Sequence, residues 1–247
     1  MGGGFGGKTR NRQVVEAARL AVLTEKPVQV AWTRAEEFFY DTFRPAAVIR
    51  IASGLSSSNR MVFWDYHVHY AGDRGAISCY DAPHQRGAPS GKGRGMACGI
   101  YKGTYVAALG EAEVDKSSGR CRLKRVVFAQ DMGEVINPEG ARMQIEGYVM
   151  MGLGYAFSET IRFRNGEIID LKFDTYQIPT FSWMPKITVL LIDNPDIGPQ
   201  EGGEPAITCM GALAANVVFD ATGIRFNELP LTPERVREGL KSVKKAT

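Results

Sequence analysis

The sequence predicts an α+β fold in which mixed sheets pack against helices. Segments with the two-residue alternation of strands and segments with helical periodicity both occur, but they do not follow the regular strand–helix–strand order of a doubly wound parallel sheet. Of the 247 residues, 44% are hydrophobic and 23% are charged, a composition typical of globular proteins. A chain of this length can bury a substantial core as one large domain or two small ones.

The first third of the chain predicts an amphipathic helix and two strands. Residues 11–26 place apolar side chains on one helical face, and Pro27 follows shortly afterwards. The segment VQVAWT at 28–33 predicts a short strand, and TRAEEF at 33–38 has the pattern of a helix start with surface charges. The segment MVFWDYHVHY at 61–70 alternates as a half-buried strand does.

A glycine-rich and basic segment predicts a boundary between two domains. Residues 84–99, HQRGAPSGKGRGMACG, contain few apolar side chains and several glycines, which is typical of a loop. We therefore expect a first domain over residues 1–88 and a second domain over residues 89–247.

The second domain predicts a hairpin, further strands and three helices. The segments 104–115 and 120–131 flank the turn sequence KSSG, which is a strong hairpin signal. A helix follows Asn137 as its cap, with Pro138 at the first helical position. The remaining predicted elements are strands near 160–164 and at 186–193, a helix from about 205 to 222 that Gly223 ends, and a terminal helix that Thr232 caps.

The composition argues against several classes of function. The net charge of +3, from 30 basic and 27 acidic residues, is too small to indicate nucleic-acid binding. The 4 cysteines form no C-x-x-C pair, so they predict neither a zinc or iron–sulfur site on this chain nor a disulfide framework. No apolar run approaches the roughly 20 residues of a membrane span, and the start of the chain lacks the pattern of a signal peptide. These features predict a cytoplasmic protein.

The opening segment MGGGFGGKT matches the phosphate-binding pattern G-x-x-x-x-G-K-[ST]. That motif requires a buried strand immediately before it, and only Met1 precedes it here. A nucleotide site would also need Lys8 and Thr9 to converge with Asp193. The glycines nevertheless let backbone N–H groups converge at the start of a helix, which favours an anion site, and a flexible N-terminal tail is the alternative.

Five segments together resemble one protein family. They are GGGFGGK, AWTRAEEF and the three longer stretches 130–159, 173–195 and 202–236. In this order they closely resemble the molybdopterin-binding subunit of the xanthine dehydrogenase and aldehyde oxidase family, in the branch of the bacterial nicotinate dehydrogenases and isoquinoline 1-oxidoreductases. The resemblance extends over nearly the whole chain, and five motifs in one order make it specific.

The resemblance implies a molybdenum hydroxylase, which hydroxylates an aldehyde or an N-heteroaromatic carbon of a small molecule with water. It implies a molybdenum cofactor, as molybdopterin or its cytosine dinucleotide form, that holds the metal without a ligand from this chain. It also implies an iron–sulfur partner subunit that takes the electrons, FAD or haem on partner chains, and a second molybdopterin subunit. An exported partner of this kind could carry the chain to the periplasm.

The resemblance also assigns site residues. The family's catalytic base lies in the motif GEP, which places it at Glu204, and the chemistry requires that carboxylate close to the reacting atoms. The family's glycine loop surrounds the metal and corresponds to Gly4, Phe5 and Gly6. The glutamine of Q-x-E-G, which contacts the pterin, corresponds to Gln144. Without the resemblance, Glu204 would be an ordinary carboxylate at a helix start, and Gln144 would be a surface residue of a helix.

Two departures from the family pattern leave a second hypothesis open. The chain lacks the region that precedes the glycine loop in the family, and only QRGAP separates YDAPH from SGKGRG, where the family has a long stretch. We interpret these departures as a truncation and an internal deletion. The chain is therefore either a hydroxylase subunit or a non-catalytic remnant that binds a partner. The first hypothesis requires Glu204, Phe5 and Gln144 to converge on one cavity. Two further residues, Tyr101 and Lys102, receive no role from the sequence.

Overall fold

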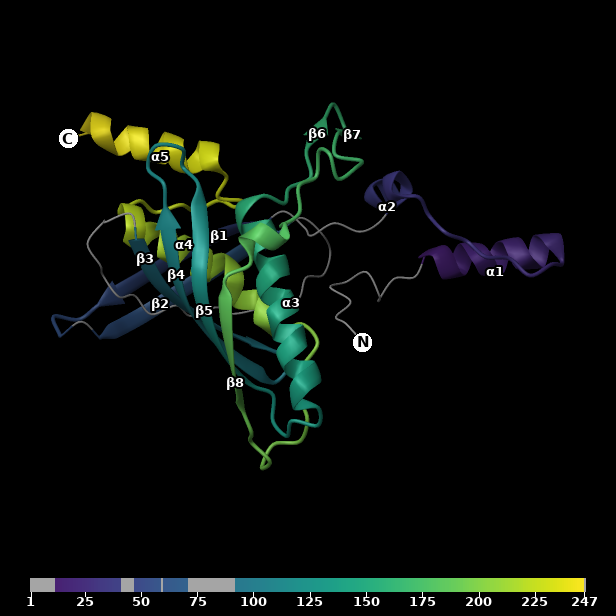
Figure 1. The fold of residues 1–247 in the computed structure, drawn as a ribbon, viewed down its shortest axis with the longest axis horizontal. Coiled ribbons are helices and arrows are strands. Elements are labelled where there is room, and N and C mark those ends of the chain that lie inside the picture. The colour runs from purple at the N-terminus through teal and green to yellow at the C-terminus, as the bar shows by residue number, and fades with distance from the viewer. Residues whose placement is uncertain (1–11, 41–46, 59, 71–91, 247) are drawn as a thin grey trace. The chain divides into compact units, whose positions relative to one another are not determined.

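The computed structural model describes residues 12–40, 47–58, 60–70 and 92–246, and these residues form an α+β structure, as predicted (Figure 1). They group into two compact units: Asp41–Ile77 is one, and Met1–Tyr40 together with Ser78–Thr247 is the other. The predicted domain division at residue 88 falls outside the described residues.

The larger unit is built on a four-stranded sheet with the order β3-β4-β5-β8. Its strands are β3 (Lys92–Tyr101), β4 (Thr104–Val114), β5 (Cys121–Asp131) and β8 (Lys186–Ile192). The first three are antiparallel, whereas β8 runs parallel to β5. The hairpin predicted around KSSG is confirmed as β4 and β5, and the strand predicted at 186–193 is confirmed as β8.

Strand β3 corrects the prediction of a loop over residues 84–99. From Lys92 to Tyr101 the chain pairs with β4 in an unbroken antiparallel register. Its glycines indicated a loop because glycine weakens a strand when only local preference counts. Here the pairing with β4 satisfies the backbone hydrogen-bonding groups, and a helix packs directly on the glycine positions.

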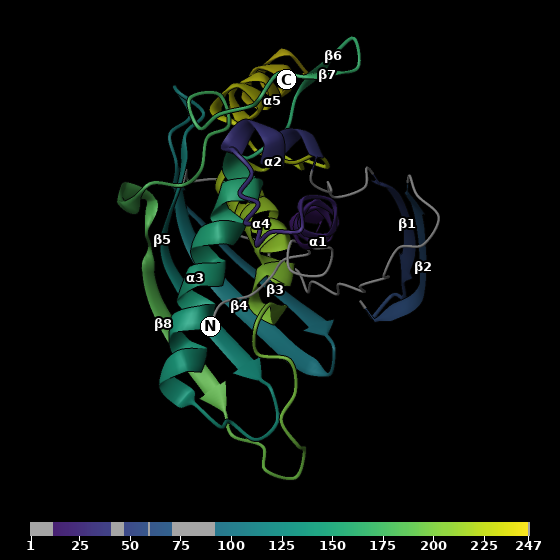
Figure 2. The same ribbon diagram turned by 90° about the vertical axis from the view of Figure 1, so that its right-hand side faces the viewer.

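Helices α3 (Pro138–Phe157) and α4 (Met210–Thr222) cover one face of this sheet (Figure 2). Helix α4 contacts β3 and β4, and helix α3 contacts β8 and α4. Burial along β4 alternates accordingly: Val106 and Ala108 are buried beneath the helices, whereas Tyr105 and Leu109 on the other face are 54% and 53% exposed. We call the side that carries Tyr105 and Leu109 the open face of the sheet.

Glycines allow α4 to approach the sheet closely. A Cβ atom at Gly93 would overlap the carbonyl oxygen of Val217, and a Cβ atom at Gly95 would lie 2.7 Å from the Val217 nitrogen. The side-chain amide of Asn216 donates a hydrogen bond to the Met96 carbonyl at 2.9 Å. At Gly93 and Gly95 the helix therefore lies against the backbone of β3 with no strand side chain between them, and the Asn216 side chain adds a hydrogen bond beside them.

Local capping signals predicted the helix ends correctly. The Asn137 side chain accepts a hydrogen bond from the Gly140 amide at 3.0 Å at the start of α3. Gly223 ends α4 with a φ of 76°, in the left-handed region that favours glycine. The Thr232 hydroxyl accepts a hydrogen bond from the Arg235 amide at 3.3 Å in the first turn of the terminal helix.

The remaining helices and strands of the larger unit are shorter or lie outside the sheet. They are α1 (Arg12–Thr24), α2 (Arg34–Tyr40), β6 (Phe163–Arg164), β7 (Glu167–Ile168), the 3₁₀ helices η1 (Phe181–Trp183) and η2 (Pro205–Cys209), and α5 (Pro233–Ala246). The strand predicted near 160–164 is confirmed only as the short β6. By length and composition alone, one described segment, Pro205–Thr222, could cross a membrane, and here it forms η2 and the core helix α4.

Residues 28–33 form no strand, which corrects the prediction for VQVAWT. Thr33 instead begins α2 through a capping box. Its hydroxyl accepts a hydrogen bond from the Glu36 amide at 3.3 Å, and the Glu36 carboxylate accepts one from the Thr33 amide at 2.7 Å. The helices predicted at 11–26 and at TRAEEF are confirmed as α1 and α2.

The smaller unit is an antiparallel hairpin of β1 (Ala47–Leu55) and β2 (Met61–Tyr70). The strand predicted for MVFWDYHVHY is confirmed as β2.

We expect Gly93→Ala to destabilise the protein by about 1–3 kcal/mol, because the added methyl group would overlap the main chain of α4. Gly147→Ala is the matched control, since a Cβ atom at this exposed position within α3 has no neighbour within 4 Å. That variant should stabilise the protein by about 0.5–1 kcal/mol. Guanidinium unfolding measures both changes, and equal stability of the two variants would contradict the close packing of α4.

The buried Asp170 predicts a pH dependence of stability. Its carboxylate accepts hydrogen bonds from the Arg162 guanidinium at 2.6 Å and the Arg162 amide at 2.7 Å, and these bonds hold the pKa of Asp170 below its usual value. The stabilisation is therefore complete above the unfolded pKa of about 4 and is lost as the pH falls through the lowered folded pKa. The stability difference between the wild type and Asp170→Asn should shrink below pH 4 in unfolding titrations, and a difference that stays the same at every pH would contradict this role of Asp170.

Candidate functional site

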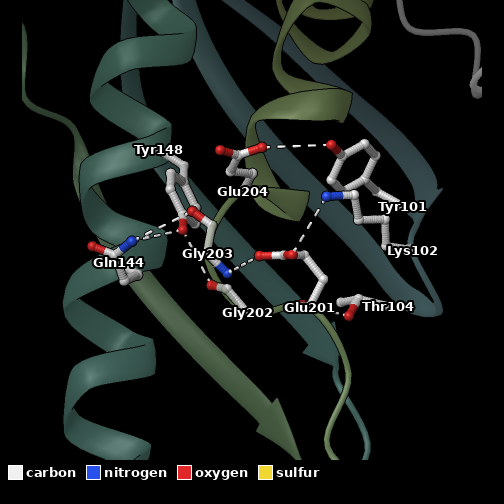
Figure 3. A network of polar contacts seen from close by, with 9 residues as sticks. All are labelled: Tyr101, Lys102, Thr104, Gln144, Tyr148, Glu201, Gly202, Gly203 and Glu204. Carbon is white, nitrogen blue, oxygen red and sulfur yellow. Dashed lines mark hydrogen bonds and ion pairs between the residues drawn. The ribbon is translucent and has the colours of Figure 1, made fainter. Parts of the chain in front are cut away.

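The loop of residues 201–204 lies between helix α3 and the turn that joins β3 to β4 (Figure 3). Glu204 ends this loop and directly precedes η2, which runs into α4. Although Glu204 occupies the cap position of η2, its side chain makes no capping hydrogen bond to that helix. The half-buried carboxylate therefore points into the site and is not used to hold the helix start.

Two side chains of α3 hold the main chain of this loop. The Tyr148 hydroxyl donates to the Gly202 carbonyl at 3.1 Å, and the Gln144 side-chain amide donates to the Gly203 carbonyl at 3.4 Å. The same amide donates to the Tyr148 hydroxyl at 2.8 Å. Gln144 and Tyr148 lie one helical turn apart, so both reach the loop from one face of α3.

The loop is also anchored on its other side. The hydroxyl of the buried Thr104, at the start of β4, donates to the Glu201 carbonyl at 2.5 Å. The Glu201 carboxylate accepts a hydrogen bond from the Gly203 amide at 2.8 Å. The loop is thus fixed by groups from α3, from β4 and from its own first residue.

The turn between β3 and β4 brings two further side chains to the site. Lys102 and Gly103 have φ values of 46° and 84°, the pattern of a two-residue hairpin turn with both central residues in the left-handed region. The Lys102 ammonium lies 3.8 Å from the Glu201 carboxylate, and the Tyr101 hydroxyl lies 3.5 Å from the Glu204 carboxylate. The sequence-based prediction missed both residues because it placed β3 in a loop. Once a strand is recognised there, Lys-Gly between two strands indicates this turn.

Negative charge and burial dominate the electrostatics of the site. Burial raises the pKa of Tyr148 to about 12, an effect that the hydrogen bond from Gln144 opposes and the charges of Glu201 and Glu204 reinforce. The pKa of Lys102 is also raised, mainly by its electrostatic interaction and hydrogen bond with Tyr101 and to a smaller extent by the charges of Glu201 and Glu204. Tyr148 therefore keeps its proton and remains a donor throughout the ordinary pH range, and Lys102 remains a cation beside the two carboxylates.

The structure brings two of the predicted site residues into one polar network. Gln144 contacts the Gly203 carbonyl, and Gly203 is the residue immediately before Glu204. The glycine loop residues Gly4, Phe5 and Gly6 lie outside the described residues, as do Lys8 and Thr9 of the alternative nucleotide site. The functional roles of Gln144 and Glu204 stay predictions.

A separate cavity lies elsewhere in the larger unit. It has a volume of about 850 Å³ and is lined by residues from the start of β5, the end of α3 and the start of α5, among them Arg122, Phe157 and Pro233. The loop of residues 201–204 lies beside the start of β4, and the start of β4 pairs with the end of β5. The cavity and the loop therefore lie at opposite ends of β5. Within the described ranges, no group of three or more His, Cys, Asp or Glu side chains is placed to hold a metal ion.

Residues 46–185, more than half of the chain, match the model of the molybdopterin cofactor-binding domain. The match includes Gln144 and ends before Glu204. Over 157 residues the chain is 36% identical to a subunit of the nicotinate dehydrogenase of Pseudomonas putida, and the matched stretch covers 60% of this chain and 13% of that protein.

Over 147 residues the chain is 29% identical to the molybdenum-binding subunit of an aldehyde oxidoreductase of Escherichia coli, and the matched stretch covers 57% of this chain and 20% of that protein.

A solved structure is also similar to part of the chain. The aldehyde oxidoreductase of Desulfovibrio gigas is 28% identical, with a TM-score of 0.51, over 56% of this chain and 15% of that one. The chain therefore spans at most one fifth of the length of each of these three proteins.

We expect Thr104→Val to destabilise the protein by about 1–3 kcal/mol, because the isosteric side chain leaves the Glu201 carbonyl without its buried donor. Thr188→Val, at a half-buried position of β8, is the control and should change stability by less than about 0.5 kcal/mol. Urea unfolding compares the variants, and an equal effect of both would contradict the anchoring role of Thr104.

Proposed function

We propose that this chain, which belongs to the family of molybdopterin cofactor-binding domains, forms part of the cofactor and substrate site of a molybdenum hydroxylase. The proposed reaction is the hydroxylation of an aldehyde or an N-heteroaromatic carbon with water. The observation that supports it is the meeting of Gln144 and the loop of Glu204 in one network, although the two come from separate elements. The names of the similar enzyme subunits support the reaction class.

The donor set at the loop fits a pterin-held metal. Gln144 uses its amide nitrogen to hold the loop, and its carbonyl oxygen points away from the loop (Figure 3). An amide in that position could bind the hydrogen-bonding edge of a pterin ring. When bound, the molybdenum cofactor would supply the redox chemistry, and we propose Gly4, Phe5 and Gly6 as further residues around it.

Glu204 is the proposed general base. Its carboxylate is half-buried, is not used to cap η2, and lies next to the hydroxyl of Tyr101. A carboxylate held in this way could accept the proton of the attacking water. Tyr101 lies beside Glu204, and Lys102 pairs with Glu201 three residues earlier, so these side chains would limit how a substrate approaches the carboxylate.

Activity of this kind would require further protein. The two relatives are named as subunits, and this chain spans only 13% and 20% of their lengths. We propose an iron–sulfur subunit as the electron acceptor, a second molybdopterin subunit, and FAD or haem on partner chains. The cofactor would be molybdopterin or its cytosine dinucleotide form.

The open face of the sheet favours a second candidate, a module that binds a partner without holding a cofactor. Several large apolar side chains on that face are about half exposed: Ile100, Tyr105, Leu109, Leu190 and Ile192. Several exposed apolar side chains on one sheet face are typical of an interaction site. The two candidates differ in whether the protein retains molybdenum.

The molybdenum and pterin contents of the purified protein test the first candidate. We expect near-stoichiometric metal and pterin when the chain is co-expressed with its neighbouring subunits. Gln144→Ala should lose most of both, because it removes a cofactor contact and a loop anchor. Gln177→Ala, at an exposed position away from the loop, is the control. If the wild type holds no metal under either condition, the hydroxylase proposal fails and the partner-binding module remains.

Glu204→Gln tests the role of the base. The variant should retain the metal and pterin of the wild type but lose about 10²–10⁴-fold in kcat, since the amide cannot accept a proton. Steady-state kinetics with an aldehyde and with an N-heteroaromatic substrate measure the change. A variant that keeps the wild-type kcat with both substrates would remove Glu204 from the mechanism.

A further inference from the structure

We infer that Tyr148 is a positioning residue for Glu204: its hydroxyl links helix α3 to the loop of residues 201–204 and thereby fixes where the carboxylate lies. This inference rests on the proposed function. Tyr148 lies outside both the motif GEP and the motif Q-x-E-G, so neither motif indicates this role.

The loop of residues 201–204 contains a hydrogen bond of its own, from the Gly203 amide to the Glu201 carboxylate, and its two glycine carbonyls are bound from outside. Gly202 and Gly203 precede Glu204, and glycine peptides sample more backbone conformations than any others. The position of the Glu204 carboxylate therefore depends on what holds the two glycine peptides in place. Among the described residues, the side chains that bind the Gly202 and Gly203 carbonyls are those of Tyr148 and Gln144.

Tyr148 is the centre of this arrangement. Its side chain is only 1% exposed, and its hydroxyl both donates to the Gly202 carbonyl and accepts from the Gln144 amide. Because a buried hydroxyl with both partners occupied has one favourable orientation, it transmits the position of α3 to the loop. The raised pKa of the phenol, which burial causes, keeps the hydroxyl protonated and therefore a donor near neutral pH.

A second tyrosine of α3 repeats the arrangement on the far side of Glu204. The Tyr155 hydroxyl donates to the Ile207 carbonyl, which belongs to η2. Tyr148 and Tyr155 are seven residues apart and therefore share one face of the helix. Helix α3 thus binds the main chain before and after Glu204. The bond of Tyr148 acts on the glycine side, where it binds the Gly202 carbonyl and Gln144 binds the Gly203 carbonyl.

Tyr148→Phe tests the inference, with Tyr105→Phe as the matched control. The first removes the hydroxyl from the loop, and the second removes a hydroxyl from the open face of the sheet. Hydrogen exchange followed by mass spectrometry measures the backbone amides of residues 201–204 and, as a reference, those of β4. We expect exchange in the loop to become at least tenfold faster in Tyr148→Phe and to stay unchanged in β4. Tyr105→Phe should match the wild type in both segments.

Kinetics of the cofactor-loaded complex give the second readout. Tyr148→Phe should lower kcat about tenfold with KM changed less than twofold, because a displaced base affects the reaction more than substrate binding. If Tyr148→Phe does not fold, Gln144→Met is the substitute for the exchange measurement, since it removes the donor to Tyr148 and Gly203 from a half-buried position.

The outcomes separate this inference from the proposed function. Loop exchange equal to that of Tyr105→Phe overturns the role of Tyr148, as does faster loop exchange with an unchanged kcat. A wild type without metal refutes the hydroxylase proposal. In that case, tenfold faster loop exchange still supports the link between Tyr148 and the loop, and unchanged exchange overturns it.

Discussion

The contact between α4 and the glycines of β3 determines where the candidate site lies. Residues 205–209 lead directly into α4, so the position of that helix sets the start of η2 and with it Glu204. At Gly93 and Gly95 the helix backbone lies against the strand backbone, and no side chain could be inserted without moving one of them. A helix held in this way has little freedom to slide, because packed interiors transmit displacements and do not absorb them. The packing of α4 on β3 therefore sets the position of Glu204.

Two kinds of glycine perform opposite tasks in this chain. Gly93 and Gly95 remove side chains so that two rigid elements can touch, which makes their surroundings stiff. Gly202 and Gly203 lie in a loop, where glycine permits more backbone conformations than other residues, so bonds from outside help to select one of them. Helix α3 supplies these bonds through the side chains of Tyr148 and Gln144. The position of α4 fixes Glu204, the residue that follows the two glycines. Glu204 thus lies where a loop held by side chains joins a helix held by close main-chain packing.

Much of the fold could be predicted because the signals were local. Asn137 before a helix, Gly223 after one and KSSG between two alternating segments each indicate structure through contacts with near neighbours. Strand β3 could not be predicted in this way, since its glycines suit a strand only once α4 packs on them. The same error concealed Tyr101 and Lys102, whose turn depends on that strand. Resemblance named Gln144 and Glu204 as site residues, but their shared network depends on pairings far apart in the sequence.

Glu201 and Glu204 show how position separates the roles of two similar side chains. Glu201 uses its carboxylate to bind the Gly203 amide and to pair with Lys102, so its acceptors stabilise the loop. Glu204, three residues later, does not cap η2, and its hydrogen bond to Tyr101 is long, at 3.5 Å. The two carboxylates therefore have different surroundings, because that of Glu201 holds the loop and that of Glu204 lies beside the tyrosine that the turn between β3 and β4 brings to the site. This difference in position is consistent with the separate role that we propose for Glu204.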